Sequence, residues 1–197
     1  MDINTTIKNL DLKKITNILE IGPGNKPTGK YIDLDNCIYE TVDINPLLPI
    51  SNTHTHFSKY FHEFETNNKY DLIIDRCCLH EQPPNSRKKY LNKINLLLNL
   101  GGQYICEHAI KHNQLFFIED NLLFDPDSNC LLAQENNNVS ICKYIPSALE
   151  IEEELKSIGF KIKTFYCHRE KKIICNRNDP VPRYHDPDLL FFMAQKH

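Results

Sequence analysis

The sequence predicts an α/β fold, a three-layer αβα sandwich whose helices cover a mostly parallel β-sheet. Two observations support this. Apolar runs typical of buried strands alternate along the chain with helix-like patterns, and the first run leads directly into a glycine-containing turn. The length of 197 residues, with 41% hydrophobic and 25% charged residues, fits one globular domain over residues 1–197.

The first three strands are expected in the N-terminal third. The apolar run 17–21 predicts the first strand, and the loop 22–28 is expected to open a short helix that ends near Asp35 and Asn36. Residues 38–43 form a second apolar run that ends in a carboxylate. Weak alternation over 53–61 indicates the third strand.

The central elements are more strongly marked. Residues 70–75 are a continuous apolar run between aspartates, which predicts a buried parallel strand. A helix is expected from Pro83 and Pro84 to the stop at Gly101 and Gly102, and residues 103–107 form the next strand. The apolar stripe of this helix comprises Tyr90, Leu91, Ile94, Leu97 and Leu98.

The C-terminal third adds a helix and two strands. Ser147–Glu150 form a capping box that starts the helix, and strands follow at about 161–167 and 188–194. The stretches 109–145 and 168–187 do not fit the alternation and are too long for plain connections. Since they leave the carboxyl ends of strands, we interpret them as insertions that wall a substrate pocket, with ordinary surface loops as the alternative.

The charge balance argues against a nucleic-acid-binding surface. The net charge is −3 and the pI about 6.3, and short basic runs such as 87–89 and 169–172 are interpreted as solvated faces. The sequence shows no apolar stretch long enough to span a bilayer and no signal-peptide pattern. We therefore expect a cytoplasmic protein with neither a nucleic acid nor a membrane as partner.

The eight cysteines lack the spacing of a metal or disulfide framework. No Cys-x-x-Cys pair occurs, so a structural zinc site is not expected. In a chain without a secretion signal, free thiols are the expected state.

The most informative motif is Glu20-Ile21-Gly22-Pro23-Gly24, followed by Asp43 at the end of the second strand. A dinucleotide-binding fingerprint requires a third glycine three residues after Gly24, and Pro27 occupies that position. Glu-x-Gly-x-Gly with a downstream aspartate instead resembles the first two motifs of class I S-adenosylmethionine-dependent methyltransferases.

The resemblance implies a Rossmann-like seven-stranded sheet with an antiparallel final strand, and S-adenosylmethionine as cofactor with S-adenosylhomocysteine as product. Glu20 would hold the loop, and Asp43 would accept the ribose hydroxyls. The acidic residue that usually follows the third strand is absent near Ser58, which leaves adenine recognition to backbone groups or apolar packing. The implied cofactor-binding residues are Glu20, Gly22, Pro23, Gly24, Asp43, Ile44, Ser58, Asp75 and Arg76.

The segment after the fourth strand resembles one branch of these enzymes. Asp75-Arg76-Cys77, followed on the next helix by Arg87 and Tyr90, is similar to the Asp-Arg-Gly and Arg-x-x-Tyr of the thiopurine and tellurite methyltransferases. Cys77 replaces the glycine of that pattern. The Asn/Asp-Pro-Pro-Tyr/Phe of methyltransferases acting on exocyclic or glutamine nitrogens is absent, so that chemistry is disfavoured.

Three residues are candidates for a catalytic role. His80 and His108 follow the fourth and fifth strands and could act as a base, with a buried structural histidine as the alternative for each. Arg76 could orient an anionic substrate, or form a salt bridge with Asp75 or Glu107. Cys77, Cys78 and Cys106 are expected near the same sheet end, as small buried hydrophobes or as soft ligands.

These observations predict a methyltransferase that acts on a small molecule, with sulfur, oxygen or a metalloid as acceptor. Three alternatives remain open: a cofactor-binding module without turnover, a methyltransferase acting on RNA or protein, and a nicotinamide-dependent oxidoreductase, which Pro27 disfavours. The sequence does not identify the acceptor or the oligomeric state.

Overall fold

A computed structural model was used to examine these expectations. The structure describes residues 7, 10, 14–34, 37–110, 122–125, 127–135, 138–168, 173–174, 183–184 and 188–197.

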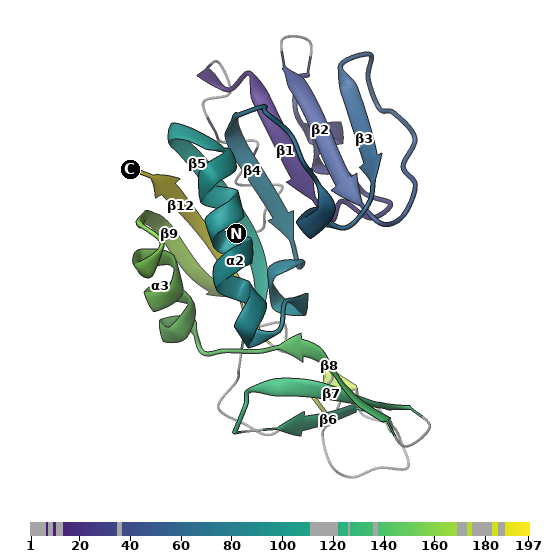
Figure 1. The fold of residues 1–197 in the computed structure, drawn as a ribbon, viewed down its shortest axis with the longest axis vertical. Helices are drawn as coiled ribbons and strands as arrows, with labels where there is room; N and C mark the ends of the chain where they lie inside the picture. Colours follow the sequence, from purple (N-terminus) through teal and green to yellow (C-terminus); the bar gives the residue numbers. More distant parts are fainter. Residues whose placement is uncertain are drawn as a thin grey trace.

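The core of the molecule is a seven-stranded sheet in the order β3-β2-β1-β4-β5-β12-β9 (Figure 1). Strand β12 runs antiparallel to both of its neighbours, and the other six strands are parallel to one another. The predicted sheet with an antiparallel final strand is therefore confirmed. The strands are β1 (Asn17–Ile21), β2 (Ile38–Asp43), β3 (His54–Ser58), β4 (Tyr70–Arg76), β5 (Leu98–Ile110), β9 (Phe160–His168) and β12 (Asp188–Lys196).

Two α-helices, α2 (Pro84–Leu97) and α3 (Ala148–Ser157), lie on one face of the sheet (Figure 1). Their apolar sides pack on the alternate strand residues that point toward them, and this forms the larger hydrophobic core. Its members include Leu19, Ile73, Tyr104 and Phe192 from the sheet, and Leu91, Ile94, Ile151 and Leu155 from the helices.

The opposite face has a second, smaller core. Ile18, Leu72 and Ile105 point to this side and are covered by the N-terminal segment, of which Ile7 and Ile15 are buried, and by the chain around Ile32 and Leu34. The second outer layer of the sandwich is thus made, in the part of the chain that the structure describes, from short segments rather than long helices.

The short helix expected after the loop 22–28 is present as a 3-10 helix, η2 (Thr28–Tyr31). Its expected end near Asp35 and Asn36 lies outside the described residues. The backbone N–H of Thr28 donates to the Glu20 carboxylate, and Gly29 disfavours a longer helix. The segment therefore closes a single tight turn.

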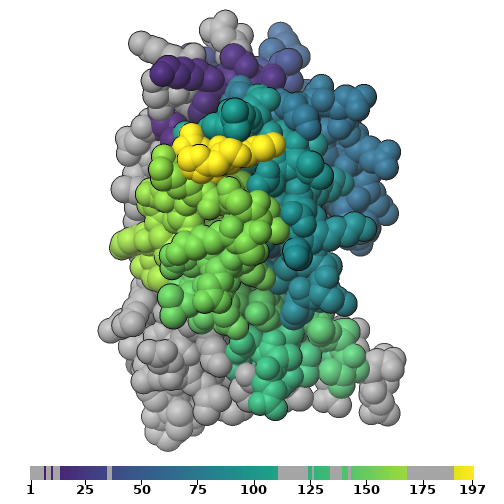
Figure 2. Space-filling model, turned by 60° about the vertical axis from the view of Figure 1, so that its left-hand side comes forward, coloured from purple at the N-terminus to yellow at the C-terminus, as the bar shows by residue number. Residues whose placement is uncertain are grey.

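Helix α2 ends at Leu97, before the glycines at which it was expected to stop. Leu98 is already extended and pairs with Tyr70 as the first residue of β5. Lysine ammonium groups satisfy free carbonyls at this end: Lys69 Nζ donates to Leu96 O at 2.7 Å, and Lys196 Nζ to Leu98 O at 2.8 Å. Figure 2 shows the C-terminal residues lying against this region.

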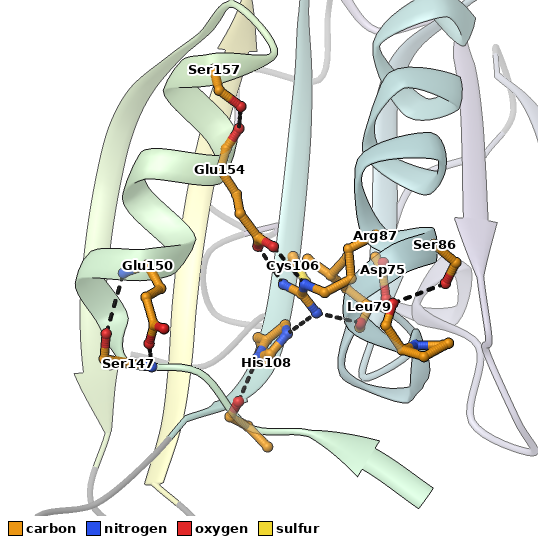
Figure 3. Close-up of polar contacts among 12 residues, drawn as sticks. Asp75, Leu79, Ser86, Arg87, Cys106, His108, Ser147, Glu150, Glu154 and Ser157 are labelled. Atoms are coloured by element: carbon orange, nitrogen blue, oxygen red, sulfur yellow. Dashed lines mark hydrogen bonds and ion pairs between the residues drawn. The ribbon is translucent and has the colours of Figure 1, made fainter. Parts of the chain in front are cut away.

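Helix α3 begins as predicted. The Ser147 hydroxyl accepts the backbone N–H of Glu150 at 3.3 Å, and the Glu150 carboxylate accepts the N–H of Ser147 at 2.7 Å (Figure 3). Both bonds of the capping box are present, so this local prediction is confirmed.

The long stretch 109–145 is partly structured. It contains a three-stranded antiparallel sheet of β6 (Leu122–Asp125), β7 (Cys130–Glu135) and β8 (Asn138–Tyr144), beyond the carboxyl ends of β4 and β5 (Figure 1). In the stretch 168–187, β10 (Ile173–Ile174) pairs with β11 (Arg183–Tyr184), and the remaining residues there lie outside the described part. Among the described residues, no helix combines the length and apolar character required to cross a membrane.

Candidate functional site

A cavity of about 280 Å³ opens at the carboxyl ends of β1, β2 and β4. Ligands of open α/β sheets bind at this edge. The lining residues are Ile21, Gly22, Val42, Asp43, Ile44, Asn45, Lys59, Tyr60, Phe61, Arg76, Cys77, Cys78, Glu81, Gln82 and Tyr90.

The Gly-Pro-Gly loop passes the cavity in a conformation that suits glycine. Gly22 has φ +66° and Gly24 has φ +54°, both in the left-handed region. A Cβ on Gly22 would lie 2.1 Å from the Cys78 Sγ, whereas a Cβ on Gly24 would meet no atom within 4 Å. Gly22 thus allows the β4 turn to approach closely, and Gly24 leaves open space above the loop.

Glu20 holds the loop from below. Its fully buried carboxylate accepts bonds from the Thr28 backbone N–H at 2.8 Å, the Thr28 hydroxyl at 2.7 Å and the Tyr39 hydroxyl. Burial raises the pKa of Glu20, while the Tyr39 and Thr28 hydrogen bonds act in the opposite direction. The carboxylate does not line the cavity, so it fixes the loop rather than offering a ligand contact.

Asp43 lies at the rim, at the end of β2. Its Oδ2 accepts the backbone N–H of Gly24 at 3.0 Å, and its Oδ1 accepts the backbone and side-chain N–H groups of Asn45 at 2.8 and 3.1 Å. The glycine loop and Asp43, which are the two separate parts of the motif in the sequence, are thus joined by a hydrogen bond. The neighbouring Ile44 lines the cavity, whereas the expected Ser58 is exposed and lies outside the lining.

The adjacent residues Asp75 and Arg76 have different positions and roles. Asp75 is fully buried, and its carboxylate accepts bonds from the hydroxyls of Tyr90 at 2.8 Å and Tyr104 at 2.9 Å and from the Cys78 N–H at 2.8 Å. Burial raises the pKa of Asp75 to about 6. Arg76 lines the cavity and donates from Nη1 to the carbonyl of Lys26, which braces the glycine loop from its other side.

The two cysteines that follow are protonated thiols. Burial is the main reason why the pKa of Cys77 rises to about 12 and that of Cys78 rises well above the usual value. Cys106 lies fully buried in the core. Within the described ranges, no group of three or more His, Cys, Asp or Glu side chains could hold a metal ion. Among the described residues, the cysteines that form no disulfide are Cys37, Cys77, Cys78, Cys106, Cys130 and Cys167.

The two histidines proposed as bases are buried and do not line the cavity. Figure 3 shows His108 beside Arg87. His108 donates from Nδ1 to the carbonyl of Ala109, and its Nε2 lies 3.0 Å from Arg87 Nη1. His80 accepts the Ala109 N–H at Nδ1 at 3.2 Å. Burial lowers the pKa of His80 to about 3 and that of His108 well below its usual value, so both rings are neutral.

Arg87 was interpreted as part of a solvated basic run, and this is wrong. Its side chain is 1% exposed and binds the Glu154 carboxylate through Nε at 2.8 Å and Nη2 at 2.6 Å, and Nη1 also donates to the Leu79 carbonyl at 2.7 Å. The ring of Tyr144, on β8, lies 4.9 Å from the guanidinium. The sequence signal for its burial was its position three residues before Tyr90 and four before Leu91, on the buried stripe of α2.

Sequence reasoning also missed much of the cavity wall. Tyr60 and Phe61 enter from the 3-10 helix η3 (Phe61–Glu63) and its preceding residue, and Glu81 from η4 (Leu79–Glu81). Burial raises the pKa of Glu81, opposed by the charge of Lys143 on β8. These residues belong to no motif, since their position depends on how the turns after β3 and β4 fold back.

Comparison with known proteins establishes the fold. No protein-family model and no curated protein matches the sequence. A SAM-dependent methyltransferase from Methanosarcina mazei is similar in structure, with TM-score 0.70 and 16% identity over 100% of this chain and 99% of that one. The 1,6-didemethyltoxoflavin-N1-methyltransferase of Burkholderia thailandensis, solved with bound 1,6-didemethyltoxoflavin and S-adenosylhomocysteine, matches with TM-score 0.67 and 16% identity, over 98% of this chain and 76% of that one.

A third similar structure is the N-methyltransferase NodS of Bradyrhizobium japonicum, in complex with S-adenosylhomocysteine. It matches with TM-score 0.60 and 14% identity, over 98% of this chain and 85% of that one. At this level of identity the likeness concerns architecture. The chain has the Rossmann-like fold of the class I SAM-dependent methyltransferases.

Proposed function

We propose that the protein is an S-adenosylmethionine-dependent methyltransferase that acts on a small molecule. The observation that carries the proposal is the direct bond between Asp43 at the end of β2 and the Gly24 N–H, at the rim of a cavity of about 280 Å³. An acceptor-only carboxylate in this position is suited to the two hydroxyls of a ribose.

The residues around the cavity fit the rest of this cofactor. Gly22 lines the cavity without a side chain, which leaves room for the cofactor's amino-acid part, and Tyr60 and Phe61 offer aromatic surface to the adenine ring. Glu20 and Asp75 act from the interior by fixing the two loops, and Arg76 joins those loops through the Lys26 carbonyl. When bound, S-adenosylmethionine supplies an electrophilic methyl group, and the protein mainly aligns the acceptor with it.

We propose that the atom that accepts the methyl group is sulfur, oxygen or a metalloid, in keeping with the resemblance to the thiopurine and tellurite branch. Two similar structures are N-methyltransferases, which adds ring and amine nitrogens to the acceptors that merit a test. A base is needed only for a protonated acceptor. Because His80 and His108 are buried and do not line the cavity, we assign them to positioning the surrounding side chains rather than to acting as the base. Glu81 is an exposed carboxylate that lines the cavity.

Calorimetric titration with S-adenosylmethionine and S-adenosylhomocysteine tests the cofactor. We expect micromolar binding by the wild type and a loss of about a hundredfold in Asp43→Ala, because two charge-assisted bonds of about 1.5 kcal/mol each would be removed. Asp127→Asn, at an exposed turn of the small sheet, is the matched control and should bind as the wild type does. Absence of binding by the wild type would contradict the proposal, and titration with NAD and NADP would then test the oxidoreductase alternative.

Turnover is a separate question. Transfer of a labelled methyl group to a panel of thiols, phenols, N-heterocycles and metalloid oxyanions should identify an acceptor. Binding without transfer to the panel, to RNA or to protein extract would favour a cofactor-binding module instead.

A further inference from the structure

A chain of four hydrogen bonds runs through the edge of the sheet and ends at the cavity. The Ile50 N–H donates to His54 Nδ1 at 3.1 Å, and His54 Nε2 lies 2.8 Å from the Thr41 hydroxyl. The same hydroxyl lies 2.8 Å from His56 Nδ1, and His56 Nε2 lies 2.9 Å from the carbonyl of Asn45. Thr41 is fully buried and His54 is 7% exposed.

The groups at the two ends of this hydrogen-bond chain determine which atom carries each proton within it. Ile50 N–H can only donate, so His54 Nδ1 accepts and its Nε2 carries the proton that is donated to Thr41. The Asn45 carbonyl can only accept, so His56 Nε2 carries the proton and its Nδ1 accepts from the Thr41 hydroxyl. Both rings are therefore neutral Nε2–H tautomers.

The last member of the chain is the residue that holds Asp43. Asn45 donates its backbone and side-chain N–H groups to Asp43 Oδ1, while Gly24 donates to Oδ2. The carbonyl of Asn45 is hydrogen-bonded to His56. It belongs to the segment that runs from Asp43, at the end of β2, to the turn at Ile50. Asp43 and Asn45 both line the cavity, whereas Thr41, His54 and His56 do not.

We propose that Thr41, His54 and His56 are positioning residues that fix the 44–50 segment, and so Asp43, for ligand binding, and that protonation of the His54 ring releases it. The identity of the ligand rests on the proposed function. A proton on His54 Nδ1 would face the Ile50 N–H. A donor would then face a donor, and one link of the chain would be lost.

The surroundings favour the neutral state at neutral pH. Burial, and then the charge of His56, lowers the pKa of His54. The titratable groups against the chain are Tyr39, whose ring centroid lies 4.9 Å from that of His54, Glu20 behind the Tyr39 hydroxyl, and Asp43 beyond Asn45. Because the pKa of His54 lies below that of an unperturbed imidazole, which is about 6.5, the release belongs to solution more acidic than that.

The buried hydroxyl can be tested by a matched pair of variants. Thr41→Val keeps the shape but leaves two ring nitrogens without their partner, whereas Thr41→Ser keeps the hydroxyl. For S-adenosylhomocysteine at pH 7.5 we expect about tenfold weaker binding by Thr41→Val and binding within about twofold of wild type by Thr41→Ser. Unfolding curves would confirm that both variants are folded. Equal affinity of the two variants would overturn the proposal.

A pH profile separates positioning from a merely structural role. In His54→Gln the amide nitrogen can replace Nε2 as the donor to the Thr41 hydroxyl, but it does not titrate. We expect the wild-type affinity for S-adenosylhomocysteine to fall as the pH is lowered from 7.5 to 5, and that of His54→Gln to change much less. Parallel profiles would overturn the proposal.

The outcomes distinguish this proposal from the proposed function. If the wild type does not bind S-adenosylhomocysteine, both fail; if it binds but the variants show no difference, only the positioning role fails. Nitrogen NMR of the imidazoles gives a readout without any ligand. Both rings should be Nε2–H tautomers at pH 7.5, and an Nδ1–H tautomer at either one would overturn the chain.

Discussion

Cys77 has a backbone conformation that glycine adopts more easily. Its φ of +64° lies in the left-handed region, at the position where the thiopurine and tellurite branch has glycine. An L-residue pays about 1–2 kcal/mol for this conformation. Glycine would adopt this backbone conformation without that cost.

Cys77→Gly and Cys77→Ala therefore form an informative pair. Both remove the thiol, but only glycine removes the Cβ that makes φ +64° unfavourable. We expect the glycine variant to have the higher free energy of unfolding, by roughly 1 kcal/mol after the greater freedom of its unfolded chain is included. Urea unfolding of the two variants measures this, and a more stable alanine variant would contradict the interpretation.

Alanine substitutions at Gly22 and Gly24 distinguish the effect of backbone strain from that of steric contact. Both have positive φ, but only a Cβ at Gly22 would meet another atom, at 2.1 Å from Cys78 Sγ. Gly24→Ala should lower the free energy of unfolding by about 1–2 kcal/mol from strain alone. Gly22→Ala should lower it by a further 1–3 kcal/mol because the β4 turn must move. Thermal or urea unfolding would show the order, and equal losses would exclude the role of the contact.

How far the site residues could be predicted depends on whether their role is local. The structure joins Glu20, Gly22 and Asp43 at one loop because they stand at the carboxyl ends of the neighbouring strands β1 and β2, which the sequence marks as apolar runs. Arg87 was misjudged because its neighbours in the sequence are exposed lysines, although its partners are Glu154, Leu79 and His108. The pairing of Thr41 with His54 and His56 depends on the register of β2 and β3, which no local pattern specifies.

At the scale of elements, one buried ion pair connects the two helices. Arg87 of α2 holds Glu154 of α3 in a two-pronged contact, and the Glu154 side chain is 29% exposed. Without this carboxylate, a guanidinium that is almost completely enclosed would lack its counter-charge. The pair therefore fixes how α2 and α3 pack against each other over the sheet.

Glu154→Gln should consequently lower the free energy of unfolding by about 3 kcal/mol. The matched control is Glu152→Gln on the same helix, whose pair with Lys156 is exposed and should matter by no more than about 0.5 kcal/mol. Denaturant unfolding of both variants gives the comparison. Similar small losses in the two would show that Arg87 is compensated by its carbonyl and histidine contacts.

Elements with strong local signals were predicted well, and elements that depend on tertiary contacts were not. The capping box at Ser147 and the buried run of β4 are encoded within a few residues. The short helix after the glycine loop is a single 3-10 turn, and Gly29 within it disfavours a longer helix. The sheet of β6, β7 and β8 escaped prediction because antiparallel pairing within an insertion leaves only short, weakly alternating strands.

For the whole molecule, the buried ionisable groups predict opposing effects of pH on stability. The folded state lowers the pKa of His54, His80 and His108, so their contribution is complete above about pH 6.5 and is lost as the pH falls below it. The folded state raises the pKa of Glu20 and Asp75. The contribution of Asp75 is complete below about pH 3.8 and is lost as the pH rises through about 6.

Variants that remove one group of each kind should change the pH dependence in opposite directions. His80→Asn keeps an acceptor for the Ala109 N–H but takes up no proton on unfolding, so the stability lost between pH 6.5 and 5 should be smaller by about 2 kcal/mol. Asp75→Asn removes a group that favours acidic solution, so stability should rise more steeply with pH between about 4 and 6. Urea unfolding across this range tests both, and unchanged slopes would show that water reaches these side chains in the native state.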